Sequence, residues 1–490
     1  MVVPCGVGTC SLDRFATSTS GMKRLAVISG FDSQFKWGGQ LGKKFFGAGY
    51  DVQFFCPEVR HNQVSDAQLK SYDIPFPINW CQKSEIFSSL RLLEFDVVLI
   101  SLPAGLTEEG TLSLKRTFEE AATLYPDNPS VRRRPIIVAG FVGINYENRI
   151  GSVVARRLTD IVLANSEEER RFLNETAQRL SLTQPTIVTA GLGLIDSGNE
   201  PRHAPKAKRR RRVLFAAQPT VPKTKAEKIY LLLKLRELAK AQPDWTVALK
   251  PRHRPGEGTF HKDDNHLEDL ARDFLVVEDI PPNLIFDYRP IVTQLSETDL
   301  VMTVSSTAAV EAHAAGIPIA IVTDFGIKEP YGAEFFADCG ALATFDEIKK
   351  GAWPTLNAAW VARNVAYSNQ HFSEVLAAID ECAARQRASG TMLPFADTAY
   401  DVARAEAIEF IEEWRAARRK TAWVKEVTSG AVPISTEPRK AMTAPTLVAR
   451  PTPARGQLDT LRRKTRKLLR DPEAFFRDSR YFSRGKDERE

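Results

Sequence analysis

A turn of three hydroxyl-bearing residues has the composition of an anion site. Ser305-Ser306-Thr307 lies between an apolar run at residues 300–304 and an alanine-rich helical run at residues 308–315. A further apolar run follows the helix, and this order predicts one right-handed βαβ unit. Unpaired backbone N–H groups and the positive dipole end at the start of a helix favour an anion. The hydroxyls add donors there, so the segment predicts a phosphate-binding turn.

Glu311 lies one helical turn beyond these hydroxyls. A carboxylate at that position could accept hydrogen bonds from both hydroxyls of a ribose. The alternative is that Ser306 or Thr307 simply caps the helix, with Glu311 on a solvated face. Capping uses one hydroxyl and leaves the other two without a role, which favours a nucleotide-binding site.

Three cations and a histidine follow another apolar run. Residues 246–250 predict a strand, and Lys250, Arg252, His253 and Arg254 lie at its carboxyl end or just beyond it. Arg binds phosphate through paired hydrogen bonds and Lys acts as a point charge. A histidine could stabilise or protonate a departing phosphate. The alternative is an exposed basic loop, but ligands of open parallel sheets bind beyond the carboxyl ends of strands, and this favours an anion clamp.

A polar, glycine-bearing loop is predicted at residues 31–39, after the first apolar run. It lacks the GxGxxG spacing of a dinucleotide site. Asp32 and Lys36 are expected to face a cleft between two domains. Asp32 is a candidate general base there, and a turn-forming aspartate is the alternative. Asn145 and Glu147, in a later loop, are further candidates of the same kind.

Short apolar runs alternate with helical patterns along most of the chain, which predicts parallel sheets covered on both faces. The fold class expected is α/β, with two Rossmann-like doubly wound domains followed by C-terminal helices. Strands are predicted at residues 23–29, 51–56, 96–101, 135–140, 161–165 and 186–190, and then at 213–218, 246–250, 275–277, 300–304, 319–322 and 341–345.

Composition shifts divide the chain further. Met22 precedes a strand directly, so Met1 and Met22 are both possible starts. The predicted parts are a disordered or non-native start at 1–21, an N-terminal acceptor domain at 22–197, a linker at 198–212, a C-terminal donor domain at 213–350, terminal helices at 351–420, a disordered linker at 421–455 and a basic amphipathic tail at 456–490.

The composition excludes several classes of protein. Hydrophobic residues make up 43% and charged residues 26% of the chain, as in ordinary soluble globular proteins. No apolar run approaches the roughly 18 residues that a membrane-spanning helix needs. The start lacks the pattern of a signal peptide, so a cytoplasmic location is expected. None of the six cysteines forms a CxxC pair, and neither a metal nor a cofactor is expected.

The net charge of +6 is unevenly placed, with basic clusters at residues 202–212 and 462–470. The first lacks interleaved aromatic residues, so it is interpreted as a solvated linker and no nucleic-acid partner is expected. The second belongs to a predicted basic helix at residues 457–470, which two aromatic pairs follow. Such a tail could dock onto an anionic membrane surface, or pack on the protein body or a partner.

These features resemble a known family. Two Rossmann-like domains with terminal helices are similar to the GT-B architecture of nucleotide-sugar glycosyltransferases, and in particular to a group of uncharacterised bacterial members. The segment SSTAAVEAHAAGIP resembles the one that holds the donor nucleotide, and KPRHRPGE resembles the Lys-Pro-His-Pro-type loop of capsule glycosyltransferases, polysialyltransferases and teichoic-acid glycerophosphotransferases. The resemblance implies that His253 acts on the donor phosphate, that Ser305, Ser306 and Thr307 bind it, and that Glu311 contacts the ribose.

The function expected is metal-independent transfer of a sugar from a nucleotide-sugar donor to an acceptor hydroxyl. Arg252 and Arg254, which depart from the family pattern around His253, would help to offset charge on the departing phosphate. Asp32 would deprotonate a glycan or lipid-linked acceptor in cell-envelope polysaccharide biosynthesis, with the enzyme peripheral at the inner membrane face. Three alternatives stay open: a nucleotide-sugar 2-epimerase, a phospho-alditol transferase that moves glycerophosphate, and a non-enzymatic nucleotide-binding scaffold.

Overall fold

A computed structural model describes residues 22–30, 32–58, 69–70, 72–126, 128, 131–144, 149–180, 185–192, 210–255, 265–275 and 279–395. All of these belong to one compact unit, Met1–Ile434, and a second unit is Ser435–Glu490. The predicted start, most of the linker, the terminal helices beyond residue 395, the disordered linker and the basic tail lie outside the described residues.

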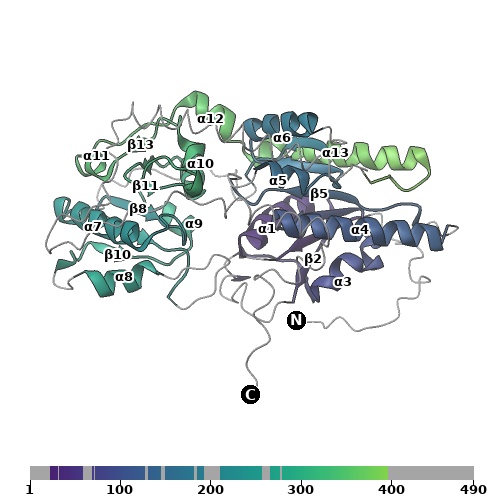
Figure 1. The fold of residues 1–490 in the computed structure, drawn as a ribbon, viewed down its shortest axis with the longest axis horizontal. Coiled ribbons are helices and arrows are strands. Elements are labelled where there is room, and N and C mark those ends of the chain that lie inside the picture. The colour runs from purple at the N-terminus through teal and green to yellow at the C-terminus, as the bar shows by residue number, and fades with distance from the viewer. Residues whose placement is uncertain are drawn as a thin grey trace, which may run out of the picture. The chain divides into compact units, whose positions relative to one another are not determined.

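A seven-stranded parallel sheet comes first along the chain (Figure 1). Its strand order is β3-β2-β1-β4-β5-β6-β7, so the winding reverses between β1 and β4. Every neighbouring pair of strands is parallel. The strands are β1 (Lys23–Ser29), β2 (Tyr50–Pro57), β3 (Ile78–Cys81), β4 (Val97–Ser101), β5 (Ile136–Gly140), β6 (Ile161–Ala164) and β7 (Thr186–Thr189).

A six-stranded parallel sheet follows, in the order β10-β9-β8-β11-β12-β13, and its winding reverses between β8 and β11. Together the two sheets confirm the predicted α/β, GT-B-like fold class. The strands are β8 (Arg212–Ala216), β9 (Thr246–Lys250), β10 (Leu284–Phe286), β11 (Leu300–Thr303), β12 (Ile319–Val322) and β13 (Leu342–Ala343).

Helices cover both faces of each sheet, which explains why the inner strands are apolar throughout. On the first sheet, Phe45 and Val375 belong to one core and Phe118 to the core on the other face. The described α-helices are α1 (Asp32–Gly47), α3 (Lys83–Ser88), α4 (Ala104–Leu124), α5 (Arg149–Val154), α6 (Glu167–Arg179), α7 (Lys225–Ala241), α8 (Leu267–Phe274), α9 (Ile291–Leu295), α10 (Ala308–Ala314), α11 (Phe345–Lys349), α12 (Ala358–Asn364) and α13 (Ser368–Ser389).

The loop predicted at residues 31–39 is wrong, because α1 begins at Asp32. Glycine costs about 1 kcal/mol in a helix relative to alanine, and this propensity favoured a loop. Here packing decides instead. A Cβ on Gly38 would lie 2.9 Å from Ser29 Oγ and from Val27 Cγ1, so the glycine lets α1 approach β1 closely.

Two edge strands escaped prediction, and the strand expected at residues 275–277 is not found at Leu275, whereas residues 276 and 277 lie outside the described part of the chain. Leu275 was expected to begin a strand but follows directly on α8, whose C-terminus it caps. The outer strand of that sheet is β10, and β3 is the outer strand of the first sheet. Both are half-buried along most of their length. Neither has an apolar run as long as those of the central strands.

The terminal helices predicted at residues 351–420 include α12 and α13. Residues 365–367 between them do not belong to either helix, and the Leu192 N–H donates to the Ala366 carbonyl at 3.3 Å. Val375, Ala378 and Ile379 of α13 then join the core of the first sheet. The chain therefore returns to the first sheet after completing the second.

Candidate functional site

The carboxyl ends of β8 and β11 lie together where the second sheet reverses its winding. Ligands of doubly wound sheets bind beyond the strand ends at such a point. Ser305 follows β11 and Gln218 follows β8, and Ser305 Oγ lies 3.1 Å from Gln218 Oε1. The same hydroxyl contacts the carbonyl oxygen of Tyr331. Ser305 is buried. Its hydroxyl thus connects the ends of β8 and β11 with the turn at Tyr331.

The other two hydroxyls of the turn have different environments. Ser306 Oγ accepts a hydrogen bond from the Ala308 N–H at 3.2 Å, and the Ser306 N–H donates to Thr303 Oγ1 at 3.1 Å. Ser306 therefore makes a local cap of the kind that the alternative interpretation expected. The Thr307 hydroxyl does not cap α10. The phosphate-binding roles of these residues stay predictions.

Glu311 does not lie on a solvated face, because its side chain is only 9% exposed. Its Oε2 accepts a hydrogen bond from Lys36 Nζ at 2.9 Å. Lys36 lies on α1, which follows β1 at the point where the first sheet reverses its winding. The ion pair thus joins residues from the two topological positions at which ligands of such sheets bind.

Lys250, the last residue of β9, lies in the same electrostatic environment. Burial lowers the pKa of Lys250 to about 8, and the positive charges of Arg252 and Lys36 act in the same direction. The carboxylates of Asp287 and Glu311 oppose them. Lys36 and Glu311 are therefore close enough to act electrostatically on Lys250.

Asp287 is a charged residue of this region that the sequence did not reveal. It follows β10 and pairs with the buried Arg212 at 2.8 Å. Burial would raise the pKa of Asp287, but hydrogen bonds from Arg289 outweigh this and hold the pKa below its ordinary value. The apolar run before it is only three residues long, which is too short to mark a strand end in the sequence.

The basic loop turns its histidine inward. His253 is 8% exposed, and its ring lies 5.1 Å from that of His266 at an interplanar angle of 83°. His266 Nε2 lies 2.9 Å from the His253 carbonyl oxygen. Arg252 and Arg254 are exposed, with the Arg254 guanidinium 4.6 Å from the centre of the Tyr288 ring. The loop is thus anchored by its histidine and presents its arginines to solvent.

The candidates of the first sheet are only partly described. Asp32 is the first residue of α1, but its side chain lies outside the described part of the structure. Asn145 and Glu147 lie wholly outside it. The loop that leads to them approaches the turn after β11, since a Cβ built on Gly143 would lie 3.5 Å from Thr307 Cγ2. These three candidate roles stay predictions.

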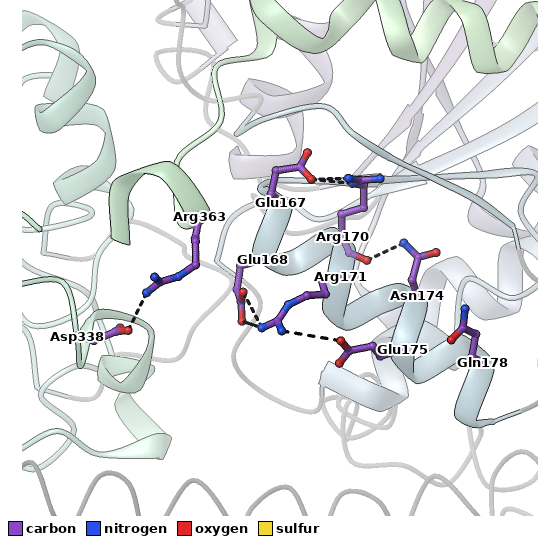
Figure 2. Close-up of a pocket in the computed structure, with 9 residues that line it drawn as sticks. All are labelled: Glu167, Glu168, Arg170, Arg171, Asn174, Glu175, Gln178, Asp338 and Arg363. Atoms are coloured by element: carbon purple, nitrogen blue, oxygen red, sulfur yellow. Dashed lines mark hydrogen bonds and ion pairs between the residues drawn. The ribbon is translucent and has the colours of Figure 1, made fainter. Parts of the chain in front are cut away.

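A surface groove of about 850 Å³ lies elsewhere, and none of the predicted site residues lines it. Figure 2 shows its charged side chains paired with one another, including Arg170 with Glu167 and Arg363 with Asp338. Because this charge is already compensated, we do not assign a ligand to the groove. Its lining residues are Glu167, Glu168, Arg170, Arg171, Asn174, Glu175, Gln178, Asp338 and Arg363.

The described residues contain neither a metal-binding cluster nor a membrane-spanning helix. They contain no group of three or more His, Cys, Asp or Glu side chains that could hold a metal ion. Over the same ranges, no helix combines the length and the apolar character needed to cross a membrane.

Comparison with known proteins identifies the family. A family model described as "Putative glycosyltransferase (DUF6716)" matches residues 25–382. The chain belongs to this family. The match spans both sheets and reaches α13, and it confirms the resemblance to glycosyltransferases drawn from the sequence. No curated protein matches the chain.

Several solved structures are similar at low identity. MnaA of Staphylococcus aureus, in a co-structure with UDP, is 15% identical with a TM-score of 0.43, over 68% of this chain and 87% of that one. Acinetobacter baumannii MurG is 13% identical with a TM-score of 0.37, over 76% and 96%. Arabidopsis thaliana UGT89C1, complexed with UDP-L-rhamnose, is 13% identical with a TM-score of 0.43, over 75% and 100%. Similarity at this level carries no information on substrate.

Proposed function

We propose that this member of the DUF6716 family transfers a sugar from a nucleotide-activated donor to an acceptor hydroxyl. Family membership supports glycosyl transfer. The observation that supports the donor site is the ion pair of Lys36 with the buried Glu311, which acts electrostatically on Lys250 at the end of β9. Two ammonium groups beside a buried carboxylate complement the phosphates and the ribose hydroxyls of a nucleoside diphosphate.

In this proposal catalysis is mainly electrostatic. Positive groups held in a partly buried site stabilise the charge that develops on the departing phosphate, because little reorganisation is needed. Lys250 and Lys36 supply this charge from the strand ends, and Arg252 and Arg254 add to it from the exposed loop. This density of cations takes the place of a divalent metal, and no cofactor is involved.

The remaining roles follow from position in the chain. Asp32, at the start of α1, would deprotonate the acceptor hydroxyl. His253 would act on the leaving phosphate, and the anchoring of its ring against His266 would hold the loop in place. The acceptor would be a glycan or a lipid-linked glycan of the cell envelope. The basic residues at 456–490 would bring a cytoplasmic enzyme to the inner membrane face.

A ligand panel tests the donor site. Nucleoside diphosphates and nucleotide sugars of each base are added to the full chain in buffer with EDTA, and the unfolding temperature is measured. A ligand that binds the native state raises this temperature by mass action. We expect at least one nucleotide series to do so. If no ligand shifts the unfolding temperature, the protein does not bind these nucleotides, and the proposed donor site is contradicted.

Product analysis then separates the reaction classes. With the nucleotide sugar that binds best and no acceptor, a transferase leaves the sugar unchanged apart from slow hydrolysis. Formation of an epimer under these conditions would establish a 2-epimerase instead. With a CDP-alditol and an acceptor in place of the nucleotide sugar, release of CMP together with transfer of the phospho-alditol to the acceptor would establish the glycerophosphate alternative. Unchanged turnover in His253→Ala would remove His253 from the mechanism.

A further inference from the structure

The Glu311 carboxylate has two candidate partners. In the proposed function it binds the ribose of the donor, and in the structure it accepts a hydrogen bond from Lys36 at 2.9 Å. The two side chains are 9% and 22% exposed, so the ion pair is largely shielded from water. A ribose whose two hydroxyls use both oxygens of the Glu311 carboxylate must therefore take Oε2, the oxygen that accepts the hydrogen bond from the Lys36 ammonium.

Lys36 also acts electrostatically on Lys250. The two ammonium groups repel each other, and the Glu311 carboxylate attracts Lys250. If Glu311 exchanged its partner for neutral ribose hydroxyls, the Lys36 ammonium would lose its direct counter-charge while staying near a second cation. A diphosphate placed between the two lysines would restore that counter-charge.

We propose that Lys36 and the donor ribose compete for Glu311, and that the ammonium displaced by the ribose binds the donor phosphates. This inference rests on the proposed function and adds Lys36, from the first sheet, to the groups that bind the donor. It also makes recognition of the two parts of the nucleotide interdependent. A nucleoside breaks the ion pair without compensating Lys36, whereas a nucleoside diphosphate supplies both partners. The ion pair therefore discriminates against nucleosides.

Lys36→Met separates the two effects, because it removes the charge and keeps an unbranched side chain. Binding of UDP, GDP, CDP and ADP, and of the four matching nucleosides, is measured by calorimetry for the wild type and the variant. The nucleoside diphosphate that binds the wild type best should bind the variant about tenfold more weakly or worse, since a charge-assisted hydrogen bond to phosphate is lost. The matching nucleoside should bind the variant more tightly, by about threefold or more, since Glu311 has no ammonium to exchange.

Lys43→Met is the matched control. Lys43 lies on the same helix and pairs with Asp73 at 3.1 Å, but the Asp73 side chain is 90% exposed. We expect this variant to bind both ligands as the wild type does. The unfolding temperature of each variant establishes that it is folded.

The proposal requires that Lys36→Met binds the nucleoside diphosphate more weakly and the nucleoside more tightly than the wild type does. If the nucleoside does not bind Lys36→Met more tightly than the wild type, the exchange is overturned, whatever happens to the diphosphate. An unchanged affinity for the diphosphate overturns the assignment of Lys36 to the phosphates. If none of the eight ligands binds the wild type, the proposed donor site fails, and this inference fails with it.

Discussion

Lys250 is the cation of the proposed site that loses its charge most easily as the pH rises. Burial and the neighbouring Arg252 hold its pKa at about 8. Phosphate binding favours the ammonium form, so above pH 8 the protein must take up a proton to bind the donor. We expect the affinity for the nucleoside diphosphate to be constant below about pH 7.5 and to fall by up to about tenfold per pH unit above about pH 8.5.

Calorimetry between about pH 7 and about pH 10 measures this profile. Lys250→Arg is the control, because a guanidinium stays protonated throughout. Its profile should be flat. A wild-type profile as flat as that of Lys250→Arg would show that Lys250 does not bind the phosphates.

For single residues, the sequence indicated which side chains belong to the proposed site but not which side chains they contact. Lys250 and Glu311 were assigned from their places beyond predicted strands, since parallel strands bring their carboxyl ends to one edge. The Lys36–Glu311 ion pair joins residues 275 positions apart, and no local pattern encodes such a contact. The packing of His253 on His266 was hidden for the same reason. Side-chain type and local order are local information, whereas pairing depends on the folded topology.

Between elements, a buried arginine ties the end of the described chain to the first sheet. Arg134 precedes β5 and pairs with Asp160 at 2.6 Å, with its own side chain fully buried. It also donates to the Leu393 carbonyl at 2.9 Å, and its guanidinium lies 4.2 Å from the Phe395 ring. The Gln386 amide of α13 donates to the Arg134 carbonyl at 3.0 Å. Arg134 thus forms an ion pair within the first sheet and also binds the segment that follows α13.

Arg134→Met should lower the free energy of unfolding by about 3–5 kcal/mol, because it leaves the Asp160 carboxylate without its cation. Urea unfolding at neutral pH measures the loss. Arg363→Met, which breaks a pair with Asp338 whose partners are both about half exposed, should cost about 1 kcal/mol or less. Equal losses in the two variants would mean that the Arg134 pair contributes no more than a surface pair.

Strands could be predicted from the sequence where they are buried along their whole length. Central strands such as β4 and β5 are buried along their whole length, and their apolar runs marked them. The edge strands β3 and β10 lack such runs. The start of α1 was missed because Gly38 reads locally as a helix breaker, although its packing against Val27 is what requires a glycine. Tertiary contacts override propensity at such positions.

For the molecule as a whole, the fold class followed from alternation of strands and helices, and the family match over residues 25–382 agrees with it. The predicted domain limits at 22–197 and 213–350 stay predictions. Alternation indicates parallel sheets covered by helices, but it does not determine where one compact unit ends. The tail at 456–490 is a separate hypothesis, drawn from charge and aromatic residues alone.

The basic tail at residues 456–490 is expected to bind anionic membranes. Six cations within residues 462–470, followed by Phe475 and Phe476, should bind vesicles that contain phosphatidylglycerol but not vesicles of phosphatidylcholine. The attraction should weaken at about 1 M salt, where the screening length falls to about 3 Å. Co-sedimentation of the full chain and of a variant lacking residues 456–490 measures this. We expect the deletion to abolish vesicle binding and to leave the affinity for nucleoside diphosphate unchanged. Equal sedimentation of the two proteins would assign the membrane contact, if any, to another part of the chain.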